Sequence, residues 1–367
     1  MLRDWIEGRV HEVFGNINFS ITHFEFEFLN HLRNIGNAMQ AKLAKTNDTF
    51  TGDSLLAVCS YVGILQLTEW CLDNSANTNS YNNYNEHVLY TACIHNRHHI
   101  VCRLLDDADK KYINVHVYNQ TFYKACQCGF KEIVIRLLKE TIDVNDSYSS
   151  PATPLFIACK HGHVQIVSIL LNQKADEIDI NKGKRQSYYD MMKTPLYIAC
   201  KRGHIEIVSM LLTSPGIDVN MRRDNFKTPL YAASAGGYTY IVSLLLKHDS
   251  QGINKARIHG ATSLFVACQK GHAEVVTVLL NQKSILINEC MFTGMSPLFI
   301  ASLQGHTQIV ELLLSSNSDV NICFKNKATV EYEFKQYSMR IMLSYVNLFG
   351  FKQHISKFEE LLRVLNG

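Results

Sequence analysis

Apolar residues fall into short runs along most of this chain, and runs of the same kind return at a fixed spacing. One kind starts with a hydroxyl residue and a proline and closes at a glycine, as from residue 194 to 203. The other follows the glycine and carries apolar residues three and four positions apart, as from 207 to 212. Such spacing gathers apolar side chains on one face of a helix. The pattern therefore predicts pairs of short helices, repeated along the chain.

One sequence position marks the period of these helix pairs. Steps of 34, 33, 33, 41, 34, 34 and 34 residues separate its eight occupants, most of which are cysteine. They are Cys59, Cys93, Cys126, Cys159, Cys200, Ser234, Cys268 and Ser302. A fixed period of this size is typical of stacked small units that contact only their neighbours. It favours a long binding surface over a catalytic pocket.

Polar residues at the expected helix ends support this assignment. Thr or Ser stands where the N-cap of a first helix is expected, and proline follows at the first helical position. A glycine after the short helix allows a left-handed stop. An asparagine after a β-branched residue tolerates left-handed backbone and is expected to bond its own turn, which suits the start of a hairpin. The prolines are Pro154, Pro195, Pro229 and Pro297, the glycines are Gly162, Gly203, Gly237, Gly271 and Gly305, and the asparagines are Asn145, Asn181, Asn220, Asn254, Asn288 and Asn321.

The repeated phrase resembles the ankyrin repeat. Thr-Pro-Leu at 194–196, Ala199, Gly203-His204 and the Ile-Val-x-x-Leu-Leu run at 207–212 carry the resemblance in one unit. It is specific from residue 151 to 321 and weaker from 53 to 145. The resemblance implies an all-α solenoid, an ankyrin repeat array of helix-turn-helix units joined by β-hairpin loops. It also implies a protein–protein interaction module.

The chain is expected to have three parts. Residues 1–50 would form a helical N-terminal cap, since Phe24, Phe28, Leu32, Ile35 and Met39 lie at helical spacing. Residues 51–327 would form eight repeats, of which the first three are degenerate. Residues 328–367 would form a degenerate repeat and a helical C-terminal cap, because the end faces of an array must be covered. The alternative for this tail is a separate helix that binds a partner.

Composition and charge fit a packed chain inside the cell. The hydrophobic fraction is 47% and the net charge is +3. The first residues include acidic side chains and no long apolar stretch, so we expect no secretory signal. No run approaches the roughly 20 apolar residues that a membrane span needs. These features favour a location in the cytoplasm or nucleus.

The eleven cysteines do not have the spacing of a disulfide framework or of a zinc site. Six occupy the repeating position, and packed helices about 8–10 Å apart exceed the roughly 7 Å between Cα atoms that a disulfide allows. We therefore expect buried free thiols in a reducing compartment. The histidines that follow the repeat glycines are expected to bond loop backbone, and no cofactor or metal is expected. These histidines are His163, His204, His272 and His306.

An aromatic residue follows the repeat leucine in nearly every unit. A column this regular is expected to pack between repeats, and the alternative is an aromatic strip on the binding face. The column comprises Tyr90, Tyr123, Phe156, Tyr197, Tyr231, Phe265 and Phe299.

The longest step along the chain reveals an insertion in the hairpin at residues 182–193. Loops carry function more often than frameworks do, and Tyr, Met and Arg are enriched at protein interfaces. The alternative is a tolerated surface insertion. The candidate partner-binding residues are Lys182, Lys184, Arg185, Tyr188, Tyr189, Met191 and Met192 in this loop, with Arg222, Arg223, Phe226 and Arg257 at the next hairpin tips.

Nothing in the sequence points to catalysis, because it contains no phosphate-binding glycine motif, nucleophile elbow or zinc-protease helix. We expect a monomeric adaptor that binds a protein partner on the hairpin and short-helix face. The alternative is a binder of nucleic acid or anionic lipid through basic hairpin tips. The small net charge does not demand nucleic acid, and a steep loss of affinity with salt would distinguish phosphate binding from a packed protein interface.

Overall fold

The computed structural model describes most of the repeat region and divides into two compact units, with the boundary between Asp143 and Val144. The described residues are 55–63, 65–73, 76–82, 84–106, 113–146, 152–174, 176–183, 193–221, 226–257 and 259–319. The expected caps at 1–50 and 328–367 lie outside these residues.

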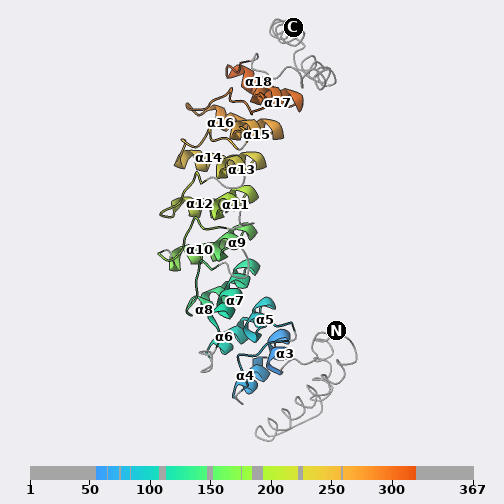
Figure 1. The fold of residues 1–367 in the computed structure, drawn as a ribbon, viewed down its shortest axis with the longest axis vertical. Helices are drawn as coiled ribbons and strands as arrows, with labels where there is room; N and C mark the ends of the chain where they lie inside the picture. Colours follow the sequence, from blue (N-terminus) through green and yellow to red (C-terminus); the bar gives the residue numbers. More distant parts are fainter. Residues whose placement is uncertain are drawn as a thin grey trace, which may run out of the picture. The chain divides into compact units, whose positions relative to one another are not determined.

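The described residues form sixteen helices in eight pairs (Figure 1). The first unit holds α3 (Leu55–Val62), α4 (Leu65–Asp73), α5 (Val88–Ile94), α6 (His98–Asp106), α7 (Val115–Cys128) and α8 (Lys131–Leu137). The second unit holds α9 (Pro154–His161), α10 (Val164–Gln173), α11 (Pro195–Arg202), α12 (Ile205–Thr213), α13 (Pro229–Gly236), α14 (Thr239–His248), α15 (Ser263–Lys270), α16 (Ala273–Leu280), α17 (Pro297–Leu303) and α18 (Thr307–Ser315).

Within each unit the helices lie in two layers. The first helices of successive pairs pack side by side, as α9, α11, α13, α15 and α17 do in the second unit. The second helices, α10 to α18 in even numbers, form the other layer. This arrangement confirms the all-helical repeat array predicted from the sequence.

The first helices of the second unit begin and end as predicted. The Thr194 hydroxyl accepts a hydrogen bond from Tyr197 N at 3.1 Å, and Pro195 occupies the first turn. Gly203 then ends the helix at a φ of +78°. The same N-cap bond is made by Thr153, Thr228, Thr262 and Ser296. Each cap satisfies a backbone N–H that the helix leaves without a partner.

Three of the histidines that follow a repeat glycine, His204, His272 and His306, reach back to the preceding repeat. His272 Nε2 lies 3.2 Å from Ala235 O, and His306 Nε2 lies 3.4 Å from Gln269 O. A Cβ on Gly237 would lie 2.7 Å from the His272 ring, so this close approach requires glycine. The histidines thus hold neighbouring repeats together, which confirms the expected structural role. Tyr238 takes this place over Gly203.

The asparagine column has a different role from the one predicted. None of its described members has a positive φ. Instead the Asn181 amide donates to Gly216 O at 2.8 Å and accepts from Asp218 N at 3.0 Å, so it bonds the backbone of the next repeat. Asn145 and Asn254 do the same. The local turn is made by the preceding aspartate, since Asp179 Oδ1 accepts from Asn181 N.

Two of the described loops between repeats close in tight turns, and the described residues contain no β-strand. Arg257 N donates to Ala261 O at 3.0 Å, and Met291 N donates to Met295 O at 3.0 Å. Each pair closes a hairpin that is too short to extend into strands. These two predicted hairpins are therefore present as hydrogen-bonded turns.

The core lies between the repeats. Phe156 and Phe265 are each 2% exposed, and Tyr197 is 3% exposed. Burying a side chain of this size stabilises the fold by about 1.5–3 kcal/mol. The aromatic column is thus buried at most positions in the second unit and half-buried at Tyr90, Tyr123 and Phe299. This burial agrees with the favoured interpretation, in which the aromatic column packs between repeats.

The first unit keeps the helix pairs with different local chemistry. His87 replaces threonine as the N-cap of α5, and its Nδ1 accepts from Leu89 N at 3.1 Å. Asn96 takes the glycine position at a φ of +56°. No proline limits the start of α7, which extends over 14 residues from its N-cap Asn114. This longer helix was not predicted.

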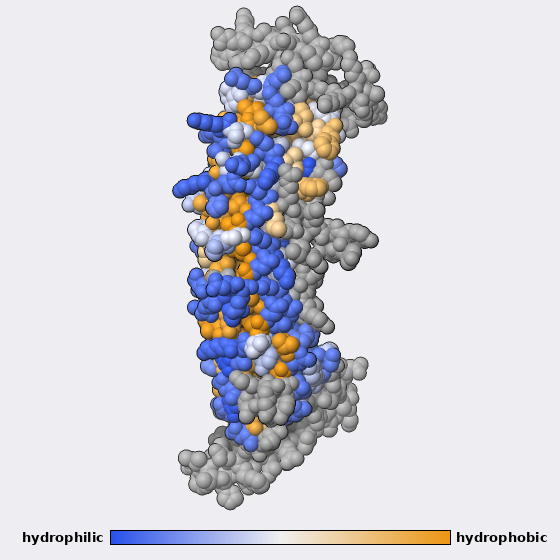
Figure 2. Space-filling view, turned by 60° about the vertical axis from the view of Figure 1, so that its left-hand side comes forward, coloured by the Kyte–Doolittle hydropathy of each residue, from blue (hydrophilic) through white to orange (hydrophobic). Residues whose placement is uncertain are grey.

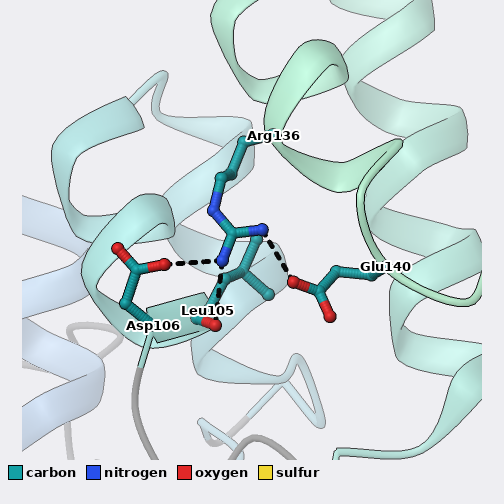
Figure 3. Close-up of polar contacts among 4 residues, drawn as sticks. All are labelled: Leu105, Asp106, Arg136 and Glu140. Atoms are coloured by element: carbon teal, nitrogen blue, oxygen red, sulfur yellow. Dashed lines mark hydrogen bonds and ion pairs between the residues drawn. The ribbon is translucent and has the colours of Figure 1, made fainter.

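Arginine–aspartate pairs join the second helices of the first unit. Arg136 Nη2 lies 2.6 Å from Asp106 Oδ1 and donates to Leu105 O at 2.9 Å (Figure 3). Its Nη1 contacts Glu140 Oε1 at 2.7 Å. Arg103 and Asp73 form the same pair one period earlier, at 2.9 Å. The Arg136 guanidinium therefore also satisfies a carbonyl at the end of α6, where orphan acceptors occur.

Replacing Gly203 with Val should destabilise the second unit more than replacing Gly216 with Val. Both residues have left-handed backbone, with φ of +78° and +75°. That conformation costs a residue with a Cβ about 1–2 kcal/mol. A Cβ on Gly203 would also lie 2.5 Å from the Tyr238 ring, whereas a Cβ on Gly216 meets nothing within 4 Å. Displacing the ring should add about 1–3 kcal/mol. If urea denaturation shows that the two variants lose the same free energy of unfolding, the contact between residue 203 and the Tyr238 ring would be contradicted.

The stability of the first unit should fall as the pH drops from about 6.5 toward 4. Burial lowers the pKa of His87 to about 4, whereas a histidine in the unfolded chain has a pKa near 6.5. The unfolded chain therefore binds a proton before the folded chain does, and acid favours unfolding. His87→Ser keeps an N-cap oxygen and removes the titration. The free energy of unfolding measured at pH 7 and at pH 5 should differ less in this variant than in the wild type. An unchanged difference would mean that a group other than His87 causes it.

Candidate binding surface

The described members of the predicted site, Lys182, Phe226 and Arg257, lie in hairpin loops that precede first helices of the second unit. Figure 1 shows these loops and the first helices α9 to α17 following one another along this unit. The N-cap bonds fix where each loop enters its helix. The loop tips and the first-helix ends together are called the hairpin face below.

The inserted loop leaves and rejoins the framework at one point. A Cβ on Gly183 would lie 1.4 Å from Lys193 O, so the two ends of the loop touch and only glycine fits there. The Thr153 hydroxyl donates to Lys182 O at 3.0 Å, which ties the base of the loop to the preceding repeat. The framework is thus complete without the insertion. Lys184, Arg185, Tyr188, Tyr189, Met191 and Met192 lie outside the described residues.

Phe226 occupies an unusual position at the next hairpin. Its side chain is 40% exposed, and its φ is +63°. Two residues before the N-cap, the same slot holds Asn85 at +59°, Gly260 at +83° and Gly294 at +87°. Glycine or asparagine suits such backbone, whereas a bulky residue there is an outlier. Arg222 and Arg223 lie outside the described residues.

The register of the repeats could have revealed this slot. Phe226 stands 34 residues before Gly260, which itself stands 34 before Gly294. A phenylalanine at a position that holds glycine in other repeats indicates either a different backbone conformation or a strained one. The backbone of Phe226 has the strained conformation, with a positive φ.

The third and fourth hairpins add a cation and an aromatic ring. Arg257 is half-buried, and its Nη1 lies 3.5 Å from the Tyr231 hydroxyl. Phe292 is 77% exposed, and its backbone N donates to His259 O at 3.0 Å. This bond fixes one hairpin against the next. The sequence analysis missed Phe292, because it lies in a loop without a repeated motif.

The first helices of the second unit carry positive charge only. They contain four Lys or Arg residues and neither Asp nor Glu. The four are Lys160, Lys201, Arg202 and Lys270. Burial lowers the pKa of His161, and the neighbouring cations, Lys160 and Arg202 among them, lower it further. The ends of α9 and α11 therefore share a positive field.

The second helices present a different surface. Figure 2 brings this side of the molecule forward and shows mostly hydrophilic residues, with hydrophobic residues in separate patches. Exposed acidic residues occur here, at Glu206, Glu274 and Glu311. Tyr240 on α14 is 61% exposed. The two layers thus differ in charge.

Possible metal ligands and reactive thiols can be assessed among the described residues. They contain no group of three or more side chains that could hold a metal ion. Burial raises the pKa of the Cys159, Cys200 and Cys268 thiols, which therefore stay protonated and poorly nucleophilic. Every cysteine in the described part of the chain is free. Among the helices of that part, none is long and apolar enough to cross a membrane.

The comparisons with known proteins agree with the repeat architecture. A family model described as ankyrin repeats, in three copies, matches residues 122–223, 180–256 and 230–324. Together the matches span residues 122–324, more than half of the 367 residues. A search of curated proteins found no similar sequence.

Alkylation of the native protein at pH 8 should modify Cys290 before Cys159, Cys200 and Cys268. Cys290 is half-buried, while the other three are completely buried and their pKa values are raised by burial. The thiolate is the reactive form, so both effects slow the reaction. Peptide mass spectrometry after a timed iodoacetamide pulse would measure the order, with urea-unfolded protein as the control. Equal rates in the native protein would contradict the buried column.

Proposed function

We propose that this chain, which belongs to the ankyrin-repeat family, binds a protein partner through the hairpin face of its second unit. Ankyrin repeats are generally protein–protein interaction modules. The proposal names the face and its residues. It assigns the chain no catalytic role and no cofactor, and it describes a monomeric adaptor of the cytoplasm or nucleus.

One observation carries the choice of face. The hairpin face holds residues that the repeat framework does not need: a closed loop outside the 34-residue period, Phe226 in a glycine slot and Phe292 largely exposed. Interface energy concentrates in a few aromatic, Arg or similar side chains. Side chains presented on loops of a rigid scaffold lose little freedom on binding.

The free cysteines support the proposed location in the cytoplasm or nucleus. The described cysteines are free, and most belong to the packed core. Free thiols in this number are typical of proteins kept in the cytosol or nucleus.

The basic helix ends support a second candidate, which is binding of nucleic acid or anionic lipid. Lys160, Lys201, Arg202 and Lys270 could contact phosphates. Affinity that depends on phosphate contacts falls steeply with salt. A partner should therefore be captured from the source cell, identified by mass spectrometry, purified and titrated with the chain at two salt concentrations. A protein that binds directly and tolerates salt supports the proposal.

Changing Tyr188, Tyr189, Met191 and Met192 to Ser should weaken binding of the purified partner at least about tenfold, or 1.4 kcal/mol. These side chains belong to the insertion, whose ends meet at Gly183 and Lys193, so thermal stability should change by less than about 0.5 kcal/mol. Calorimetric titration and thermal melting measure the two quantities.

The matched control for this loop variant is Tyr240→Ser on α14, which removes an exposed aromatic side chain from the other layer. It should leave affinity unchanged. If the loop variant binds as tightly as the wild type, the insertion is a neutral addition. The face would then have to bind through Phe226 and Arg257.

A further inference from the structure

The charges of the second unit are segregated between its two helix layers. The first helices hold four Lys or Arg residues and no acid, whereas the second helices hold exposed Glu206, Glu274 and Glu311 and a single basic residue of this kind, Lys247. The described hairpin segments add Lys182, Lys193, Lys227, Lys255 and Arg257 against the acidic Asp146 and Glu289. In the described part of the second unit, positive charge therefore exceeds negative charge on the first helices and hairpin segments.

Helix stability alone does not account for these cations. Basic residues in a last turn do favour a helix through its dipole. However, α13 and α17 have no basic residue in their last turns and still form eight- and seven-residue helices in the same layer. The cations at the ends of α9, α11 and α15 are therefore additional to what the repeat requires.

The cations at the ends of α11 and α15 also have no acidic partner among the described residues. Among the described residues of the second unit, the ion pair that forms is Lys174–Glu177, in the loop after α10. Lys201, Arg202 and Lys270 are exposed and form no ion pair with described residues. Their positive charges can therefore interact with a binding partner. Because several positive charges lie close together, they favour a partner with acidic residues.

Phe226 supplies an apolar contact on the same face. Its backbone is in the region where Gly260 and Gly294 stand in other repeats, so a glycine would fit the slot with less strain. Strain of this kind persists where the residue serves a function. An aromatic side chain that is 40% exposed buries further area when a partner covers it.

From these observations we propose that the hairpin face binds an extended acidic segment of a protein, with carboxylates on Lys201, Arg202 and Lys270 and an apolar side chain on Phe226. This inference rests on the proposed function and specifies the chemistry of the partner. Neighbouring first helices pack about 8–10 Å apart. A polyproline II chain repeats its side-chain direction every third residue, about 9 Å along its axis. Acidic residues three positions apart would therefore meet the cations of α9 and α11, and one six positions further on would meet Lys270 of α15.

Spacing favours a peptide over nucleic acid. Phosphates follow one another at about 3.4 Å of helix axis per strand. This spacing is much closer than that of the cations, which lie one repeat apart on α9 and α11 and two repeats apart on α11 and α15. The acidic second helices on the adjoining layer would also repel a phosphate backbone. Nucleic acid is retained as an outcome of the test.

The test uses the full chain as bait and a random-peptide display library as the probe. We expect the enriched peptides to carry net negative charge, acidic residues three apart and at least one bulky apolar residue. Enrichment of peptides without an acidic bias, or of none at all, would overturn the inference. So would binding of a random single-stranded oligonucleotide in preference to the peptides, with a steep loss in salt.

Two pairs of variants locate the bound peptide. Arg202→Glu should weaken an enriched peptide at least about fivefold, while Lys247→Glu, at an exposed site in the last turn of second helix α14, should not. Phe226→Gly should weaken it at least about tenfold without lowering the melting temperature. Tyr240→Ser should do neither. Equal effects of the two charge reversals, or a Phe226→Gly variant that binds normally or melts earlier, would overturn the inference.

Protonation of His161 gives an independent readout. Burial and then the nearby cations lower its pKa in the free protein. A carboxylate placed beside Lys160 and Arg202 would offset those cations, so NMR titration should show the pKa of His161 rising when the peptide binds. An unchanged or lower value would place the peptide elsewhere.

Failure of this inference can be told from failure of the proposed function. Binding of peptides or a captured protein that have no acidic residues would contradict only the acidic specificity. Binding that does not depend on Arg202 and Phe226 would do the same. In both cases the chain would still be a protein-binding module. A chain that enriches no peptide and captures no protein that binds directly would contradict both.

Discussion

Contact between neighbouring repeats is the constraint on which the rest of this structure depends. A pair of eight-residue helices cannot bury its own apolar side chains, so each pair must pack against the next. Phe156 and Phe265 are each 2% exposed only because they lie within such a stack. Polar bonds follow the same rule, since the Asn181 amide bonds Gly216 and Asp218, and His272 bonds Ala235. Each repeat is therefore held by its neighbours, which leaves the loop tips free to vary.

Local chemistry explains what could be predicted from the sequence. Thr194, Pro195 and Gly203 act within their own helix, and their backbone requirements are the same wherever they occur. The partners of Asn181 lie about one repeat away along the chain, so its residue type suggested a local turn and not a bridge to the next repeat. Arg136 and the extended α7 were missed because their environment in the first unit departs from the repeated motif.

The candidate site was predicted less completely than the fold. Phe226 and Arg257 lie on the hairpin face as expected, whereas Phe292 was not identified. The strain at Phe226 could not be derived from composition, because it depends on a backbone angle shared with Gly260 and Gly294. The loop residues 184–192 remain a prediction from their sequence. What the structure adds is a fixed base for that loop at Gly183 and Lys193.

The account separates a framework, conserved in its geometry from repeat to repeat, from a face that carries recognition. Hydrogen–deuterium exchange of the chain with and without its purified protein partner tests that separation most directly. The account predicts added protection at the hairpin loops and first helices α9 to α15, with little change in α10, α12, α14 and α16. Protection centred on those second helices, or confined to the first unit, would contradict it.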